Sequence, residues 1–101
     1  MASTEKGVQR TVLDYLSYKK IFHWRQNSGT FKTDRGGFYN IGIVGAPDIF
    51  CVKESKLYAL EIKDIKGKLN PNQEIFRDAL EKAGGKYFVI KRLEDLIKTG
   101  I

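Results

Sequence analysis

The strongest constraint on the fold is a pair of short apolar runs, residues 48–52 and 57–63, which flank four polar residues, 53–56. Both runs are rich in β-branched, aromatic and aliphatic side chains, which favour strands. A short polar join between two such runs is typical of a tight turn between antiparallel strands. The pattern therefore predicts a β-hairpin.

The register of this hairpin would bring two acidic side chains together. With the turn centred on residues 54–55, counting outward places Asp48 opposite Glu61, and side chains directly opposite each other in a sheet lie about 4.5–5.5 Å apart. Because side chains alternate along a strand, Lys63 projects on the same face as Glu61, and Ile62 projects on the other. We therefore expect two carboxylates and one amine to crowd at one end of the hairpin.

The residues alone leave two explanations of this crowding open. Like charges that face each other destabilise a sheet. A divalent cation would offset the repulsion, since Mg²⁺ prefers carboxylate oxygens and keeps several waters. In the other explanation, Lys63 neutralises one acid, or the turn slips by one residue and moves Asp48 and Glu61 to opposite faces.

The residues around the hairpin resemble those of a known nuclease family. An Asp after a Gly-x-Pro turn, then a hairpin and Glu-x-Lys, is the PD-(D/E)XK nuclease pattern, present here as Pro47-Asp48 and Glu61-Ile62-Lys63. Five further features agree with it: Glu5 and Gln9 in the first predicted helix, the run Asn27-Ser28-Gly29, Gly45 before the Pro, and Gln73 after the Lys. Together they resemble the VRR-NUC family (virus-type replication–repair nucleases) in its minimal stand-alone form, over about Glu5 to Leu96.

The resemblance implies a fold and a metal site. The fold is α/β with a restriction-endonuclease-like core, in which a central mixed sheet is flanked by helices in the order αβ(loop)ββαβα, and residues 1–101 form one nuclease domain. The site would hold Mg²⁺, for which Mn²⁺ would substitute, through Asp48, Glu61 and the Ile62 backbone carbonyl. Glu5 would contribute through a water or to a second ion. Lys63 would orient or deprotonate the attacking water, or stabilise the transition state.

The resemblance also implies an activity and partners. The activity is metal-dependent hydrolysis of DNA by a structure-selective endonuclease in DNA repair, with a four-way (Holliday) junction as the first candidate substrate. Stand-alone members are similar to dimeric phage enzymes, so a homodimer and a phage or prophage origin are implied. A two-fold dimer would supply the two active sites that symmetric nicks require.

Other functions stay open beside this one. A flap or single-strand nuclease would use the same residues on a different substrate. A non-catalytic basic module that binds DNA or RNA would keep the charge and the aromatic residues, but it would need no acids that face each other. A structural subunit of a larger complex is a third alternative.

The composition favours a nucleic-acid partner and a cytoplasmic protein. The chain of 101 residues carries a net charge of +6, which favours a polyanion. No apolar run approaches the ~18–20 residues that span a membrane, and the N-terminus lacks the apolar region of a signal peptide. Cys51, the single cysteine, is expected to be a small buried hydrophobe in a reducing compartment.

A first helix is predicted from the N-terminal region to about residue 20, because apolar residues recur there at helical spacing. Glu5 and Gln9 fall on the same stripe as the core-facing residues of this helix. The resemblance gives Glu5 a place in the metal site, but the helix dipole also favours an acid in a first helical turn. Lys6 and Arg10 point elsewhere, and we expect them on a solvated or DNA-facing surface.

Residues 27–44 are Gly-rich and polar, and they are predicted to form an irregular loop. Lys32 and Arg35 alternate there with aromatic residues, which suits contact with a nucleic-acid backbone and its bases. Lys66 and Lys68, just past the hairpin, are predicted to contact DNA as well. The alternative is an ordinary loop whose aromatic side chains tuck inward.

A second helix is predicted after Asn70, which would be its cap, and before the glycines at residues 84–85. Gln73 stands at the capping-box position, so it can be explained by a bond back to the Asn70 backbone N–H. The resemblance instead places Gln73 beside Lys63 as a supporting residue of the site. A strand at residues 87–90 and a short helix at 93–99 complete the order.

Three aromatic residues are candidates for a dimer interface: Phe22, Trp24 and Phe38. We assign no catalytic role to His23, the single histidine, because no acidic partner stands near it in the sequence. With one His and one Cys, a Cys/His zinc site within the chain is not expected.

Overall fold

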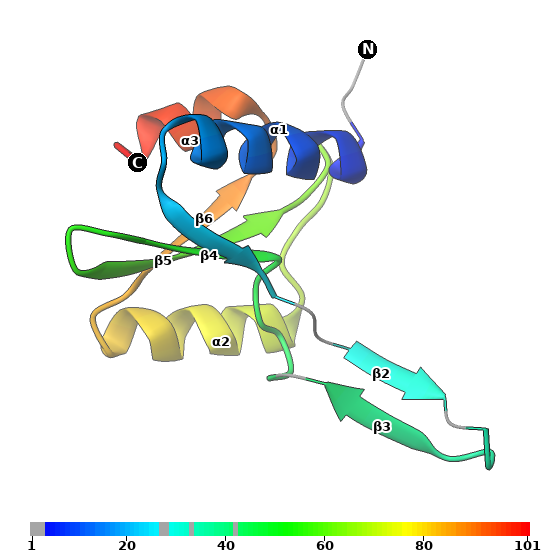
Figure 1. Cartoon of the computed structure of the whole chain (residues 1–101). Helices are drawn as coiled ribbons and strands as arrows, with labels where there is room; N and C mark the ends of the chain where they lie inside the picture. Colours follow the sequence, from blue (N-terminus) through cyan, green and yellow to red (C-terminus); the bar gives the residue numbers. More distant parts are fainter. Residues whose placement is uncertain (1–3, 27–28, 33, 42) are drawn as a thin grey trace.

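A four-stranded mixed sheet forms the centre of the molecule in the computed structural model (Figure 1), which describes residues 4–26, 29–32, 34–41 and 43–101. The strands of this sheet are β1 (Phe22–Arg25), β4 (Ile49–Lys53), β5 (Lys56–Ile62) and β6 (Lys86–Ile90). They lie in the order β1-β4-β5-β6. The β1–β4 and β4–β5 pairs are antiparallel, whereas β5–β6 is parallel.

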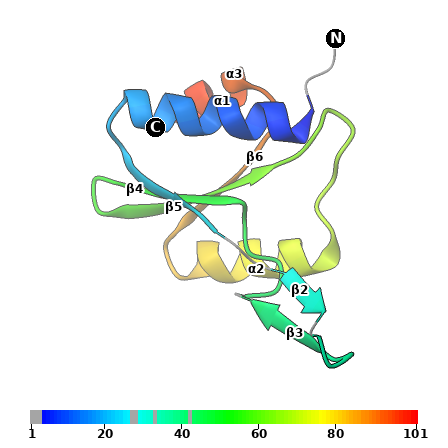
Figure 2. The same cartoon turned by 45° about the vertical axis from the view of Figure 1, so that its right-hand side comes forward.

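Helices cover both faces of this sheet (Figure 2). The first and last helices, α1 (Glu5–Tyr18) and α3 (Leu93–Lys98), lie together on one face, and α2 (Pro71–Lys82) lies on the other. Parallel neighbours need a crossover connection, and α2 supplies it between β5 and β6. The structure is thus a small mixed α/β domain with a flanked central sheet, as the sequence predicts.

The two faces of the sheet bury different sets of side chains. The face under α1 and α3 is aliphatic and fully buried at its centre, with the main contributors Val12, Leu16, Ile49, Cys51, Leu60, Ile62, Ile90 and Leu96. The buried hydrophobic cluster under α2 is smaller and consists of Phe50, Ala59 and Tyr87. No residue of α2 is itself fully buried. The α2 layer therefore covers its face less completely than α1 covers the other.

The β4–β5 hairpin has the register that the sequence predicts. Glu54 and Ser55 both have positive φ, at 52° and 67°, the combination of a type I′ turn, whose twist matches that of the flanking strands. The paired residues run from Lys53 opposite Lys56 to Ile49 opposite Leu60. The next positions outward are those of Asp48 and Glu61, so no slip separates them.

The prediction of an irregular loop at residues 27–44 is wrong. Two strands, β2 (Gly29–Lys32) and β3 (Phe38–Ile41), pair there as an antiparallel hairpin. This hairpin projects away from the sheet (Figures 1 and 2). Each strand contains β-branched or aromatic residues, and the connection includes Gly36 at a φ of 83°. Strand propensity on either side of a permissive turn outweighs the glycine content that suggested a loop.

Side-chain caps define where two helices begin. Thr4 Oγ1 accepts a hydrogen bond from the Gly7 backbone N–H at 3.0 Å at the start of α1. At α2, the Gln73 N–H donates to Asn70 Oδ1 and the Asn70 N–H donates to Gln73 Oε1, each at 2.9 Å. This reciprocal pair is the capping box predicted from the sequence. It fixes the first turn of α2 at the end of the sheet where β5 finishes.

Candidate functional site

Asp48 stands immediately before β4, at the end of the sheet where β1 and β5 finish. Its Oδ2 accepts a hydrogen bond of 2.7 Å from the Ile62 backbone N–H. Its backbone oxygen accepts one of 2.8 Å from the Gln26 N–H. The Asp48 side chain is therefore held against Ile62, the last residue of β5, by the hydrogen bond to Oδ2.

Among the residues that the structure describes, Glu61 is the one acidic side chain that is buried. It is 4% exposed and projects on the α2 face of β5, on the same side as Ala59. Its Oε1 atom is buried and has no hydrogen-bond partner among the residues that the structure describes. A buried carboxyl oxygen without a partner is costly, so this atom points to a ligand or a water at the site.

Burial and the neighbouring acid change the titration of Glu61. Burial, the Asp48 charge and a hydrogen bond to the Asp48 carboxyl group together raise the pKa of Glu61 to about 8. Lys63 acts in the opposite direction, and the charge of Glu5 adds to the rise. The hairpin register sets the two carboxyl groups close together, and at neutral pH Glu61 shares its proton with Asp48 in the absence of a cation.

Lys63 lies on the same side as Glu61, as strand alternation requires. Its Nζ atom is 3.9 Å from Glu61 Oε2, and its side chain is 16% exposed. The backbone N–H of Lys63 continues the pairing with β6 by donating to the Ile90 carbonyl at 3.1 Å. A β-carbon on Gly67 would stand 3.0 Å from the Lys63 Cβ. The glycine thus lets the 64–67 turn pack tightly on the lysine stem.

Tyr87 is a residue of this site that the sequence does not point to. It lies beside Ala59 on the α2 face through the parallel register of β5 and β6. Its hydroxyl oxygen is buried and, within the described ranges, has no hydrogen-bond partner. Burial raises the pKa of this hydroxyl, and the nearby charges of Glu61 and Asp48 raise it further. The buried region near the acid pair therefore contains a second polar atom that has no partner among the described residues.

The turn before Asp48 packs on the first turn of α2. Gly45 has a φ of 81°, and a β-carbon there would collide with the backbone carbonyl of Asn72. This contact brings Gln73 to the same end of the sheet as Asp48. The side-chain oxygen of Gln73, Oε1, accepts the capping-box hydrogen bond from the Asn70 N–H. Within the described part of the chain, Gln73 forms no hydrogen bond with Lys63. Gln73 therefore caps α2, as one of the two sequence interpretations expects, and its supporting role beside Lys63 stays a prediction.

Glu5 lies in the first turn of α1 and is exposed. Its charge reaches Glu61, since it contributes to the raised pKa of that residue. Across the described residues, however, no three His, Cys, Asp or Glu side chains form a group that could hold a metal ion. The protein therefore offers two close carboxylates and a more distant third one.

The acid pair nevertheless fits a hydrated divalent cation. The donors are hard carboxylate oxygens, and the Glu61 oxygen lacks another partner within the described ranges, which suits Mg²⁺ or Mn²⁺ and not a softer metal. Mg²⁺ is commonly bound by one or two carboxylates together with waters. Asp48 and Glu61 would hold such an ion, with the Ile62 carbonyl as the remaining protein ligand expected from the sequence.

The residues predicted to contact DNA lie apart from one another. Lys66 and Lys68 are exposed in the connection from β5 to α2, next to Lys63. Arg35 is exposed in the connection between β2 and β3, at the far end of that hairpin. The side chain of Lys32, the side chain of Phe38 and residues 27–28 lie outside the described part of the structure.

His23 and Cys51 have ordinary structural surroundings. His23 Nδ1 lies 2.7 Å from the Ile21 carbonyl oxygen, on the face of β1 opposite to Trp24. Cys51 is fully buried, and burial raises the pKa of its thiol to about 11. The thiol is therefore inert, as expected for a small buried hydrophobe.

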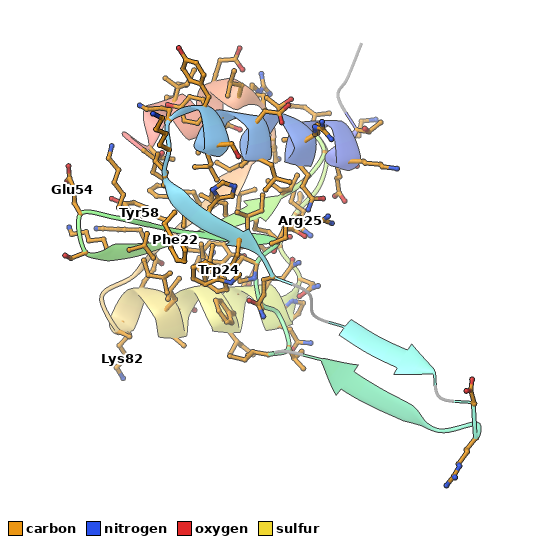
Figure 3. The ribbon with its side chains drawn as sticks, in the orientation of Figure 1. Phe22, Trp24, Arg25, Glu54, Tyr58 and Lys82 are labelled. Carbon is orange, nitrogen blue, oxygen red and sulfur yellow. The ribbon has the colours of Figure 1, made fainter. Side chains whose placement is uncertain are left out.

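Two aromatic residues of the edge strand β1 remain partly open to solvent. Phe22 is 71% exposed and Trp24 is 38% exposed, and both lie between β1 and α2 (Figure 3). Trp24 stacks on Phe50 with ring centroids 5.4 Å apart. These side chains extend the α2-face core to the edge of the sheet.

Comparison of the chain with protein-family models, with curated proteins and with solved structures found no match in any of the three. Of the helices in the described ranges, none has the length and apolarity that a membrane span needs.

Proposed function

We propose that this chain is a Mg²⁺-dependent nuclease of the VRR-NUC type, with a restriction-endonuclease-like core, that hydrolyses phosphodiester bonds in DNA. The observation that carries the proposal is the hairpin register, which sets Asp48 opposite Glu61, with the Lys63 amine 3.9 Å from Glu61 Oε2. Two acids and a lysine at the end of a buried hairpin are the arrangement that the PD-(D/E)XK resemblance requires.

The cation would supply positive charge and a bound water of lowered pKa. Asp48 Oδ2 accepts a hydrogen bond from the Ile62 N–H, so Oδ1 is the oxygen that would bind the ion. Glu61 would bind the ion in its ionised form, through the oxygen that has no hydrogen-bond partner among the described residues. A bound cation would offset the repulsion between the two ionised carboxylates, which raises the pKa of Glu61 in the free protein.

Lys63 would act on the substrate side of the acid pair. Its stem is packed by the 64–67 turn, while its amine stays partly accessible. From this position the ammonium group orients the attacking water or stabilises negative charge on the phosphoryl oxygens. Gln73 and Glu5 would support the site from α2 and α1.

Branched DNA is the substrate class that we propose, and a four-way junction is its leading member. The β2–β3 hairpin extends from the sheet and carries Arg35 at its far end, so it can reach a second arm of a branched substrate. A homodimer would place two acid pairs on one junction. The exposed rings of Phe22 and Trp24 are the surface that we propose for the dimer contact.

The test is digestion of five DNA substrates with Mg²⁺, with Mn²⁺ and with EDTA. The panel contains a four-way junction, a flap, a splayed arm, a single strand and a linear duplex. We expect metal-dependent nicks on branched DNA, and no cleavage by Asp48→Asn or Glu61→Gln. Equal cleavage by the wild type and by Asp48→Asn would reject the proposed site.

One observation favours a second function, a non-catalytic DNA- or RNA-binding module. The raised pKa of Glu61 lets the acid pair hold a shared proton at neutral pH. This proton reduces the repulsion between the two carboxyl groups without a cation. In that case the acids would be a structural feature of the hairpin end. Binding of the DNA panel with no cleavage in either metal would select this function.

A further inference from the structure

A basic hollow lies between α1 and the end of β1, outside the acid pair. It has a volume of about 260 Å³ and is lined by Lys6, Gln9, Arg10, Leu13 and Arg25. Figure 3 shows Arg25 at the end of β1 that faces the N-terminal half of α1. Three of the five lining side chains are cationic, and residues from two separate elements supply them.

The charges in this hollow are incompletely compensated. Arg10 Nε lies 3.3 Å from Asp14 Oδ1, but both side chains are well exposed, so this pair is weak and can rearrange. Neither Lys6 nor Arg25 forms an ion pair within the described part of the chain. An anionic ligand would therefore gain at least two unpaired positive charges.

The shape and chemistry suit a phosphate group. The volume of the hollow is several times the roughly 30 Å³ share of one water molecule. A guanidinium group binds phosphate oxygens in a two-pronged geometry, and a lysine adds a point charge. The Gln9 amide adds a neutral donor, and Leu13 gives the hollow an apolar wall. A phosphodiester fits this mixture of charged, polar and apolar contacts.

The hollow and the acid pair share one end of the sheet. Arg25 pairs with Ile49, the residue after Asp48, and Gln26, the residue after Arg25, donates its N–H to the Asp48 carbonyl. Lys6 directly follows Glu5, whose charge reaches Glu61. Arg25 projects on the α1 face and Glu61 on the α2 face. A strand that passes around this end of the sheet would contact both.

We propose that the hollow formed by Lys6, Gln9, Arg10 and Arg25 binds a backbone phosphate of DNA beside the phosphate at the acid pair. The position of this phosphate relative to the cut rests on the proposed nuclease function. The binding of DNA in the hollow does not, because it needs neither cation nor cleavage. It predicts sequence-independent, salt-sensitive binding.

The test measures the affinity for a fluorescent four-way junction in EDTA at several salt concentrations. The double variant Lys6→Gln/Arg25→Gln is compared with Lys56→Gln/Lys82→Gln, which removes the same charge from exposed sites at the opposite end of the molecule. Figure 3 shows Lys82 far from Arg25. It also shows Glu54 far from Arg25, and Glu54 lies in the same hairpin turn as Lys56. Urea unfolding of all variants checks that each one is folded.

We expect the hollow variant, Lys6→Gln/Arg25→Gln, to bind the junction at least about tenfold more weakly than the wild type. In a plot of the logarithm of the binding constant against the logarithm of the salt concentration, the slope should become shallower by roughly 0.9 for each phosphate that the protein no longer neutralises. The control variant should change the affinity by less than about threefold. The charge-preserving pair Lys6→Arg/Arg25→Lys should bind close to wild type. Equal weakening in the hollow variant and in the control would overturn the proposal.

Failure of this proposal and failure of the nuclease function are distinguishable. If the wild type cuts DNA and the hollow variant binds as the control does, the hollow is rejected and the nuclease stands. If no substrate is cut but the hollow variant alone loses affinity, the binding site stands and the nuclease is rejected.

Discussion

The Lys63 Nζ atom lies 3.9 Å from Glu61 Oε2, on the same side of β5 as the contact between Glu61 and Asp48. The ammonium group lowers the pKa of Glu61, in opposition to burial and the Asp48 charge, which raise it.

Lys63→Ala should slow cleavage severely while leaving DNA binding largely intact. Loss of a group that acts on the attacking water or on transition-state charge typically costs a factor of about 10²–10³ in rate. The measurements are single-turnover cleavage of the preferred substrate and its affinity in EDTA. Lys86→Ala, an exposed lysine at the start of β6, is the matched control. Cleavage by Lys63→Ala at the wild-type rate would contradict the role of the lysine.

Glu61→Gln should change how stability depends on pH. The pKa of Glu61 is raised from 4.5 to about 8, so the folded protein holds this proton more tightly than the unfolded chain does. The resulting stabilisation is fully present below about pH 4.5, and it is lost as the pH rises through about 8. Without metal, the wild type should therefore lose stability relative to Glu61→Gln between about pH 5 and pH 8.5.

Urea unfolding of both proteins in EDTA, at several pH values across that range, measures this difference. Because both proteins contain all the other titratable groups, the effect of those groups cancels to first order in the difference between the two free energies of unfolding. Parallel stability profiles of the two proteins would show that Glu61 titrates with an ordinary pKa, and that the acid contact is absent in solution.

Gly45→Ala should destabilise the fold at the join between the Asp48 turn and α2. The new β-carbon would collide with the Asn72 carbonyl, and the φ of 81° is itself unfavourable for alanine. We expect a decrease on the order of 2–4 kcal/mol in the free energy of unfolding. Gly84→Ala is the control, since its φ is 100° but no atom lies within 4 Å of a new β-carbon. Equal decreases at both positions would show that the contact with Asn72 contributes nothing.

The hairpin and its acid contact could be predicted from the sequence because these depend on local rules. A two-residue turn sets the register, and strand alternation then places Glu61 and Lys63 on one face. The cap at Asn70 follows from equally local chemistry. These features need no knowledge of the remaining fold.

The features that the sequence does not predict depend on tertiary pairing. Tyr87 joins the acid pair through the parallel register of β5 and β6, which the α2 crossover and its packing determine. Lys6 and Arg25 meet because α1 crosses the end of β1, and no spacing rule connects them. The β2–β3 hairpin is not apparent from the sequence because its glycine content obscures two short strands.

Cation binding tests the central claim most directly, because Asp48 and Glu61 should hold the ion together. Calorimetric titration with Mn²⁺ should show binding to the wild type at pH 8, and weaker binding at pH 6, because the pair must release its shared proton. Asp48→Asn and Glu61→Gln should each remove the binding at both pH values. Wild-type affinity in Asp48→Asn, or DNA cleavage by a protein that binds no Mn²⁺ or Mg²⁺, would contradict a metal-dependent nuclease at this site.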